Sequence, residues 1–179
     1  MSSARIASRY AKSLIELANE EGKLERVHED VLNFKAAAGV KDLALLLKSP
    51  IIGPEKKKTI FKALFEKAYD PLTYSFLEII LRKGREMYLS EIADEFIEQY
   101  KDIKKITTVR LTTASPLSET QMEEMKKKIV ASGLTYPNLD LKTQVNPDII
   151  GGFIIEIGDK MYNASVLHQL ESMRKSFAS

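Results

Sequence analysis

Two adjacent glycines, Gly151 and Gly152, are the residues in this sequence most suggestive of a phosphate-binding loop. Glycine-rich loops hold phosphates with backbone N–H groups, and nucleotide-binding loops continue through Lys and Ser or Thr into a helix. Here the glycines are followed by the apolar run 153–157, which predicts a strand. We therefore expect this pair to serve a tight turn or a close approach of two backbones, which glycine tolerates best.

Side chains that could act as acids, bases or metal ligands are scattered. The histidines, His28 and His168, lie far apart, and neither has the carboxylate spacing of a metal site. His28 precedes Glu29 and Asp30, and we expect this run on a solvated helix face. The adjacent carboxylate pairs lie on helix exteriors by periodicity: Glu20 with Glu21, and Glu123 with Glu124. With no cysteine and no grouping of acid, base and nucleophile, we expect no enzyme and no metal or cofactor.

Two lysine triplets, 56–58 and 126–128, could contact the phosphates of a nucleic acid. Each lies on an amphipathic stretch beside acidic residues, which favours a solvated helix face, and no aromatic side chains alternate with them to stack on bases. Together with Arg82, Lys83 and Arg85, the triplets are the basis for an alternative hypothesis, a helical RNA-binding factor acting in transcription. The net charge of +2 is too small to support that hypothesis by itself.

Composition indicates an ordinary globular protein. The 179 residues suffice for one domain or two small ones, with 44% hydrophobic and 29% charged residues. No apolar run approaches the roughly 20 residues of a membrane span. The acid-free, amphipathic stretch 1–14 has the composition of an organelle transit peptide, but its apolar stripe continues into Leu17 and Ala18. We interpret it as the first helix of the fold.

Residues 1–105 predict a six-helix bundle, because apolar side chains recur there at helical spacing between glycine and proline breaks. Asp70-Pro71 and Gly53-Pro54 are typical helix starts, and Gly22 and Gly84 are typical helix ends. The expected inward-facing residues are Ile6, Tyr10, Leu14, Leu17, Leu24, Val27, Val31, Leu32, Phe34, Ile60, Leu64, Phe65, Leu72, Phe76, Ile79, Ile80, Leu89, Ile92, Phe96 and Tyr100.

Residues 106–179 predict a small mixed α/β domain, which makes the whole chain α+β. The stretch 107–113 is β-branched, 139–145 alternates apolar with polar residues, and 153–157 forms a third strand that extends into a hairpin across Gly158-Asp159. Ser118 and Gln121 form a capping box for a helix whose inward face holds Met122, Met125 and Ile129. A final amphipathic helix starts beside Ser165.

The residues Gly151, Gly152, Gly158, Asp159, Ser165 and Val166 resemble the C-terminal signature of the ATP synthase delta subunit family, whose mitochondrial members are called oligomycin-sensitivity-conferring proteins. Asn163 departs from it, since the family usually has aspartate there. Weaker matches occur in the family's order along nearly the whole chain, at 10–14, 49–56, 81–85 and 113–118. The resemblance implies a non-catalytic stator connector of the proton-translocating F-type ATP synthase, with one copy per complex and no nucleic-acid partner. It would lie at the cytoplasmic face of a bacterial inner membrane, held there through the complex.

The resemblance also implies two partner sites. The N-terminal bundle would bind the N-terminal segments of the alpha subunits, and the C-terminal domain would bind the C-terminal coiled coil of the b subunit. The first and fifth helices carry more apolar surface than one narrow stripe requires, so a groove between them could take an amphipathic helix. Plain burial explains that surface equally well by periodicity, and the resemblance favours the groove. The candidate residues are Tyr10, Leu14, Phe76, Ile79 and Ile80 for alpha, and Val166, Leu170, Met173 and Phe177 for b.

Overall fold

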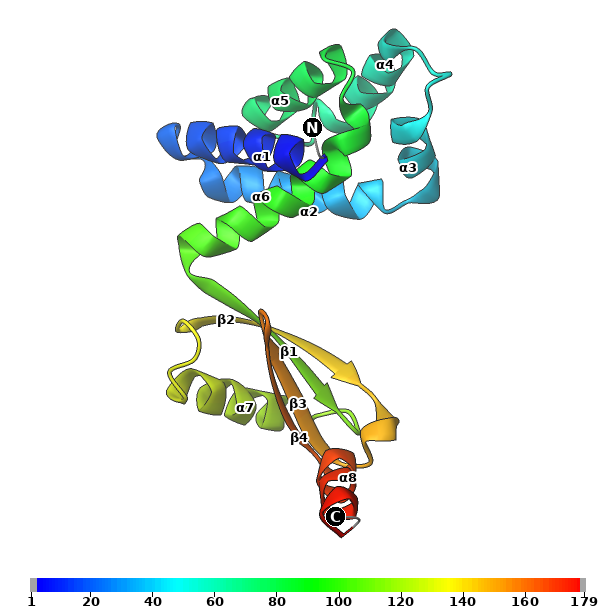
Figure 1. Ribbon diagram of the computed structural model, residues 1–179. Helices are drawn as coiled ribbons and strands as arrows, with labels where there is room; N and C mark the ends of the chain where they lie inside the picture. Colours follow the sequence, from blue (N-terminus) through cyan, green and yellow to red (C-terminus); the bar gives the residue numbers. More distant parts are fainter. Residues whose placement is uncertain (1–2, 178–179) are drawn as a thin grey trace. The chain divides into compact units, whose positions relative to one another are not determined.

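The computed structural model describes residues 3–177 and separates into two compact units, one ending at Tyr100 and one beginning at Lys101 (Figure 1). Six α-helices precede the first strand in this described range, and a four-stranded sheet with two further helices follows. The predicted α+β fold class is confirmed. The division falls a few residues before the expected boundary at 105, inside the last helix of the bundle, which continues to Lys104.

The N-terminal unit is built from helices separated by short turns. They are α1 (Ser3–Glu20), α2 (Leu24–Ala38), α3 (Lys41–Lys48), α4 (Pro54–Phe65), α5 (Pro71–Arg82), the 3-10 turn η1 (Glu86–Tyr88) and α6 (Leu89–Lys104). Asp70 caps α5 as predicted, since its carboxylate accepts a hydrogen bond from Leu72 N at 2.9 Å. Gly22 and Gly84 adopt positive φ angles of 66° and 63° where α1 and α5 end, a conformation that glycine reaches without strain.

Aromatic rings fill the centre of this unit. The rings of Phe34, Phe61 and Phe65 pack at centroid distances of 5.3–6.3 Å, and Tyr69 stacks on Phe65. The expected inward residues of α6 are all buried: Leu89, Ile92, Phe96 and Tyr100. Apolar burial of this kind supplies the main driving force for folding.

The buried face of α4 differs from the prediction. Ile60 and Leu64 are exposed, whereas Phe61 lies fully inside with Phe65, and Lys57 is also buried. The phase of the helix is set by the Phe61–Phe65 pair, one turn apart, which contributes two large rings to the core. Leu32 on α2 and Leu17 on α1 are likewise exposed, and α1 instead contacts the core through Ala7, Ala11, Leu14, Ile15 and Ala18.

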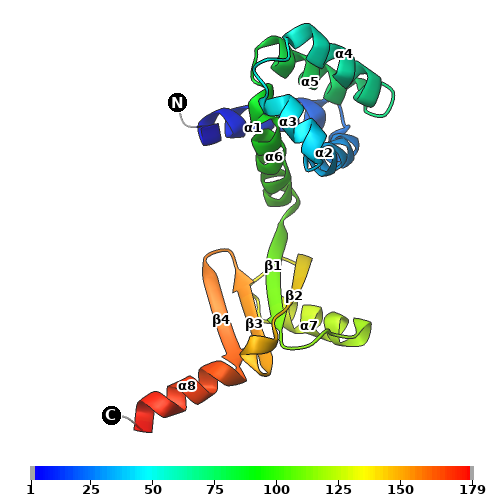
Figure 2. The ribbon, with the colours of Figure 1, turned by 90° about the vertical axis from the view of Figure 1, so that its right-hand side faces the viewer.

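The C-terminal unit is a sheet in the order β2-β1-β3-β4 (Figure 2). Its elements are β1 (Ile106–Thr113), α7 (Glu119–Ala131), β2 (Asn138–Val145), the 3-10 turn η2 (Pro147–Ile149), β3 (Gly152–Ile157), β4 (Lys160–Ser165) and α8 (Val166–Phe177). The first two strands are parallel, as a helical crossover between neighbouring strands requires, and the other pairs are antiparallel. The predicted capping box of Ser118 and Gln121 starts α7, and the predicted hairpin joins β3 to β4.

One face of the sheet holds the small core of this unit. Val109 and Leu111 of β1 are fully buried, and the register places Ile157 and Ile155 of β3 directly opposite them. The α7 helix lies along one side of the sheet and contributes Ile129 as its only buried residue (Figure 1). The facing residues of β3 stay partly exposed, so the apolar face is covered over β1 more fully than over β3.

Candidate functional site

The structure brings together two of the predicted alpha-binding residues. Tyr10 of α1 and Phe76 of α5 pack edge to face, with ring centroids 6.4 Å apart, and both are partly exposed. Arg85, just after α5, donates a hydrogen bond from Nη1 to the Tyr10 hydroxyl at 2.7 Å. We call the surface formed by Ile6 and Tyr10 of α1 with Phe76 of α5 the α1–α5 strip.

The other three predicted residues have different environments. Leu14 and Ile80 are 2% and 0% exposed, so they belong to the core beneath the strip and offer no surface to a partner. Ile79 is 39% exposed and borders a shallow hollow between α4 and α5, which Ser75 and Arg82 also line. Periodicity could not separate these positions, because core and surface residues lie within one turn of each other on both helices.

All four predicted b-binding residues lie on the surface of α8. Val166, Leu170, Met173 and Phe177 are 37–89% exposed, and α8 has no buried residue in its described length. The helix leaves the end of β4 and runs away from the sheet (Figure 2). The apolar stripe of this amphipathic helix is therefore exposed, and exposed apolar patches are typical of interaction sites.

Comparisons with known proteins decide the family. The family model of the ATP synthase delta (OSCP) subunit matches residues 6–177. The chain belongs to this family. The ATP synthase subunit delta of Carboxydothermus hydrogenoformans is 34% identical over 98% of both chains, and that of Cytophaga hutchinsonii is 35% identical over 99% of this chain and 96% of its own. In solved structures, a chain of the Toxoplasma gondii mitochondrial ATP synthase hexamer has the same fold, with a TM-score of 0.74 at 20% identity over 97% of both chains.

Family membership gives the function in outline. A delta/OSCP subunit is a non-catalytic component of the F-type ATP synthase that serves as a stator connector. In the described part of the chain, no helix is long and apolar enough to cross a membrane. The same residues contain no cluster of three or more side chains suited to hold a metal ion.

The signature glycines of this delta subunit are explained by close backbone contacts. Gly152 has a φ of 74°, and a Cβ placed there would come within 2.2 Å of the Ala164 carbonyl oxygen on β4. A Cβ on Gly151 would meet the Val166 side chain at 3.1 Å, and Gly151 O accepts a hydrogen bond from Val166 N at 3.0 Å. The pair therefore anchors the start of α8, as the backbone-approach interpretation predicts.

The remaining signature residues shape the turn and the cap that follow. Gly158 has a φ of 59° in the β3–β4 turn, next to exposed Asp159. Ser165 is buried, and its hydroxyl accepts a hydrogen bond from His168 N at 3.2 Å, which caps α8. Asn163 Oδ1 accepts from Ser165 N at 3.0 Å. The departure from the family's aspartate thus retains an acceptor at this position.

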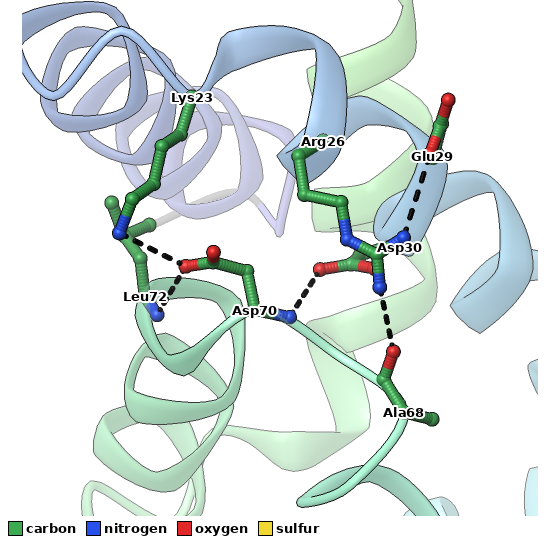
Figure 3. A network of polar contacts seen from close by, with 7 residues as sticks. All are labelled: Lys23, Arg26, Glu29, Asp30, Ala68, Asp70 and Leu72. Carbon is green, nitrogen blue, oxygen red and sulfur yellow. Dashed lines mark hydrogen bonds and ion pairs between the residues drawn. The ribbon is translucent and has the colours of Figure 1, made fainter.

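A buried carboxylate, Asp30, was missed by the sequence prediction of a solvated face (Figure 3). Asp30 Oδ2 accepts from Asp70 N at 2.8 Å, and its Oδ1 pairs with Arg26 Nη2 at 3.1 Å. Arg26 also donates to the carbonyl of Ala68 at 2.7 Å. The network ties α2 to the segment before α5. Its signal was present in the sequence, since position 30 lies on the same helical face as Val27 and Phe34.

His28, predicted on the same solvated face, instead stacks on the Tyr100 ring at a centroid distance of 3.7 Å. The Tyr100 hydroxyl donates to Glu25 Oε2 at 2.5 Å. Burial, with help from that hydrogen bond to Glu25, raises the pKa of Tyr100 to about 12. This cluster is a structural contact that joins α2 to α6.

The lysine triplet of α4 is not a uniform solvated face. Lys57 is 3% exposed and pairs with Glu86 at 2.6 Å, while Lys58 pairs with Glu78 at 3.4 Å on the surface. A buried ammonium needs such a partner, because an uncompensated charge in the interior is costly. Lys57 therefore has a structural role in the bundle. It is not available to contact RNA, so it no longer supports the RNA-binding hypothesis.

Proposed function

We propose that this subunit joins the N-terminal segments of the alpha subunits to the C-terminal coiled coil of the b subunit. One copy would serve each complex, with the N-terminal unit bound to the catalytic head and the C-terminal unit bound to the peripheral stalk. The chain would be held at the cytoplasmic face of a bacterial inner membrane through the complex. It would need no cofactor and no nucleic acid. The observation that carries the proposal is the presence of a separate exposed apolar surface on each unit.

The surface for alpha is the α1–α5 strip. Tyr10 and Phe76 present two partly exposed aromatic rings, packed edge to face, at the surface of the bundle. Aromatic anchors dominate the energetics of helix-in-groove recognition, because each buries a large area with few rotatable bonds. An amphipathic helix laid along α1 and α5 would cover both rings, and Ile79 beside the α4–α5 hollow would extend the contact.

The surface for b is α8. Its four apolar residues are spaced by four, three and four positions, which is the a/d spacing of a coiled coil. An isolated helix of 12 residues is marginal in water, so a partner helix would stabilise α8 as well as bind it. Met173 adds an adaptable side chain to this stripe.

The mechanical role follows from holding two partners at once. A stator must prevent the catalytic head from turning with the rotor, and it needs affinity and stiffness for this task. Two sites on one chain make the second binding event intramolecular, which raises the overall avidity without any new contact. Apolar burial contributes about 25 cal/mol per Å² at each site before the costs of association.

Calorimetry with a peptide of the alpha N-terminal segment tests the first site. Tyr10→Asp and Ile79→Asp should each weaken binding by at least about tenfold, because a charge is placed in an apolar contact. Ile51→Asp is the matched control, since Ile51 is 92% exposed and lies outside the strip. Circular dichroism should show an intact bundle in all three variants. Unchanged affinity in both Tyr10→Asp and Ile79→Asp would remove these residues from the site.

A further inference from the structure

Three cations at the C-terminal end of α5 have no carboxylate partner in the described chain. Arg82, Lys83 and Arg85 form no ion pair there, although lysines on the neighbouring α4 do. Basic side chains near a helix C-terminus are stabilised by the helix dipole, and Arg82 lies in the last turn of α5. A cluster of unpaired cations is a surface that attracts carboxylates from outside.

This cluster lies at one end of the α1–α5 strip. Arg85 is placed there by its hydrogen bond to the Tyr10 hydroxyl. Lys83, the C-cap residue of α5, lies seven residues after Phe76, so it follows the same side of the helix. On α1, no acidic residue precedes Glu16, and Arg5 and Arg9 of its N-terminal half also form no ion pair among residues 3–177.

The opposite end of the strip carries the opposite charge. Lys23, just after α1, reaches Asp70 at the start of α5 at 3.5 Å, so the two helices run antiparallel. Glu20 and Glu21 close α1 at this end, with Glu21 3.0 Å from Lys23. The strip is therefore basic where α5 ends and mainly acidic where α5 begins.

From this polarity we infer that the helix bound by the strip is acidic at one end and docks with that end beside Lys83 and Arg85. The inference rests on the proposed function, and it adds the chemistry and the direction of the partner helix. The apolar side chains of the strip supply affinity but do not by themselves fix the direction of a docked helix. The charges distinguish one direction of the docked helix from the other, because reversing it would place like charges together at both ends. Arg85 and Lys83 are then specificity-determining residues, and Tyr10 positions Arg85.

The test is calorimetric titration of the full chain with a synthetic peptide of the alpha-subunit N-terminal segment, at about 50 mM and about 300 mM salt. A second peptide carries amides in place of its carboxylates. Lys83→Glu, which breaks no contact in the structure, should lower the affinity for the acidic peptide about threefold to tenfold at low salt, and less at high salt. Arg85→Gln should act in the same direction. Lys48→Glu on α3 is the matched control for net charge and should stay within about twofold.

The outcomes separate the inference from the proposed function. A salt-dependent loss in Lys83→Glu, absent with the amide peptide, supports the inference. Equal effects of Lys83→Glu and Lys48→Glu, or equal affinity of the unaltered chain for both peptides, would overturn it and leave the proposed function standing. If neither peptide binds the unaltered chain, the proposed alpha site and the inference are both wrong.

Discussion

The N-terminal and C-terminal units of this delta/OSCP subunit differ in how much of their apolar surface they bury themselves. All but four of the buried hydrophobic side chains in the described chain belong to the N-terminal unit, and the exceptions are Val109, Leu111, Ile129 and Ile149. In the C-terminal unit α8 buries nothing, and Met161 and Tyr162 of β4 are exposed. The bundle thus buries most of its apolar side chains in a core of its own, while the sheet unit leaves more of its apolar surface exposed.

The largest effect should come from opening the core of the bundle. Phe61 is fully buried, so Phe61→Ala should lower the free energy of unfolding of the N-terminal unit by about 3–5 kcal/mol. Leu170→Ala on α8 should change the stability of its own unit by less than about 0.5 kcal/mol in the absence of b. Urea denaturation followed by circular dichroism measures both. Similar losses in the two variants would contradict the contrast in burial.

Two glycine substitutions compare a crowded backbone position with an open one in the C-terminal unit. Gly152→Ala should destabilise it by about 2–3 kcal/mol, because the new Cβ meets the Ala164 carbonyl and the φ is positive. Gly133 has nearly the same φ, 70°, but open space around it, so Gly133→Ala should cost about 1 kcal/mol. Hydrogen exchange of the β3 and β4 amides is the measurement. Equal protection in both variants would mean that the close approach to β4 does not matter.

The buried network of the bundle is expected to contribute less than its aromatic core. Asp30→Ala removes one of the acceptors of Arg26 and leaves the Asp70 backbone N–H without its acceptor, which should cost about 2 kcal/mol. Glu29 makes a surface pair with the same arginine, so Glu29→Ala should stay within about 0.5 kcal/mol. Thermal unfolding of the two variants compares them directly. A larger loss in Glu29→Ala would show that the network is not organised around Asp30.

The smallest expected effect is alkaline sensitivity of the bundle. Burial raises the pKa of Tyr69 and of Tyr100 to about 12 from 10.0, with further contributions from Asp30 and Glu25 respectively. The folded state therefore keeps protons that the unfolded chain loses, and stability that is present below pH 10 should fall as the pH rises from 10 to 12. Denaturation midpoints of Tyr100→Phe should fall less steeply over this range than those of the unaltered chain. Parallel pH profiles would refute this assignment.

Local signals in the sequence predicted the helix starts and turns well. The Asp70-Pro71 start, the Ser118–Gln121 capping box and the Gly158-Asp159 hairpin all depend on contacts within a few residues, which the sequence specifies directly. The choice of face was less predictable. Ile60 and Leu64 were expected inside and Lys57 outside, yet packing of the Phe61–Phe65 pair reverses this. The phase of α4 is decided by neighbouring helices, about which its own sequence holds little information.

The candidate partner residues show the same difference: they could be predicted where no neighbouring element competes for the helix face, and not where one does. On α8, no other element competes for the apolar stripe, and all four predicted residues are exposed. On α1 and α5, the core and the proposed partner surface adjoin, so periodicity placed buried Leu14 and Ile80 together with exposed Ile79. Asp30 was missed because a charged residue was assumed to be solvated, although its acceptor role needs a tertiary neighbour at Asp70.

A pull-down from detergent-solubilised membranes, with the tagged full chain and two variants, tests whether each unit binds its own partner. The unaltered chain should recover the alpha, beta and b subunits. Tyr10→Asp combined with Phe76→Asp should lose alpha and beta when the stalk is separated from the head but keep b, and Leu170→Asp combined with Met173→Asp should do the reverse. If either variant loses both sets of partners while remaining folded, or if neither loses any, the assignment of one partner to each unit is wrong.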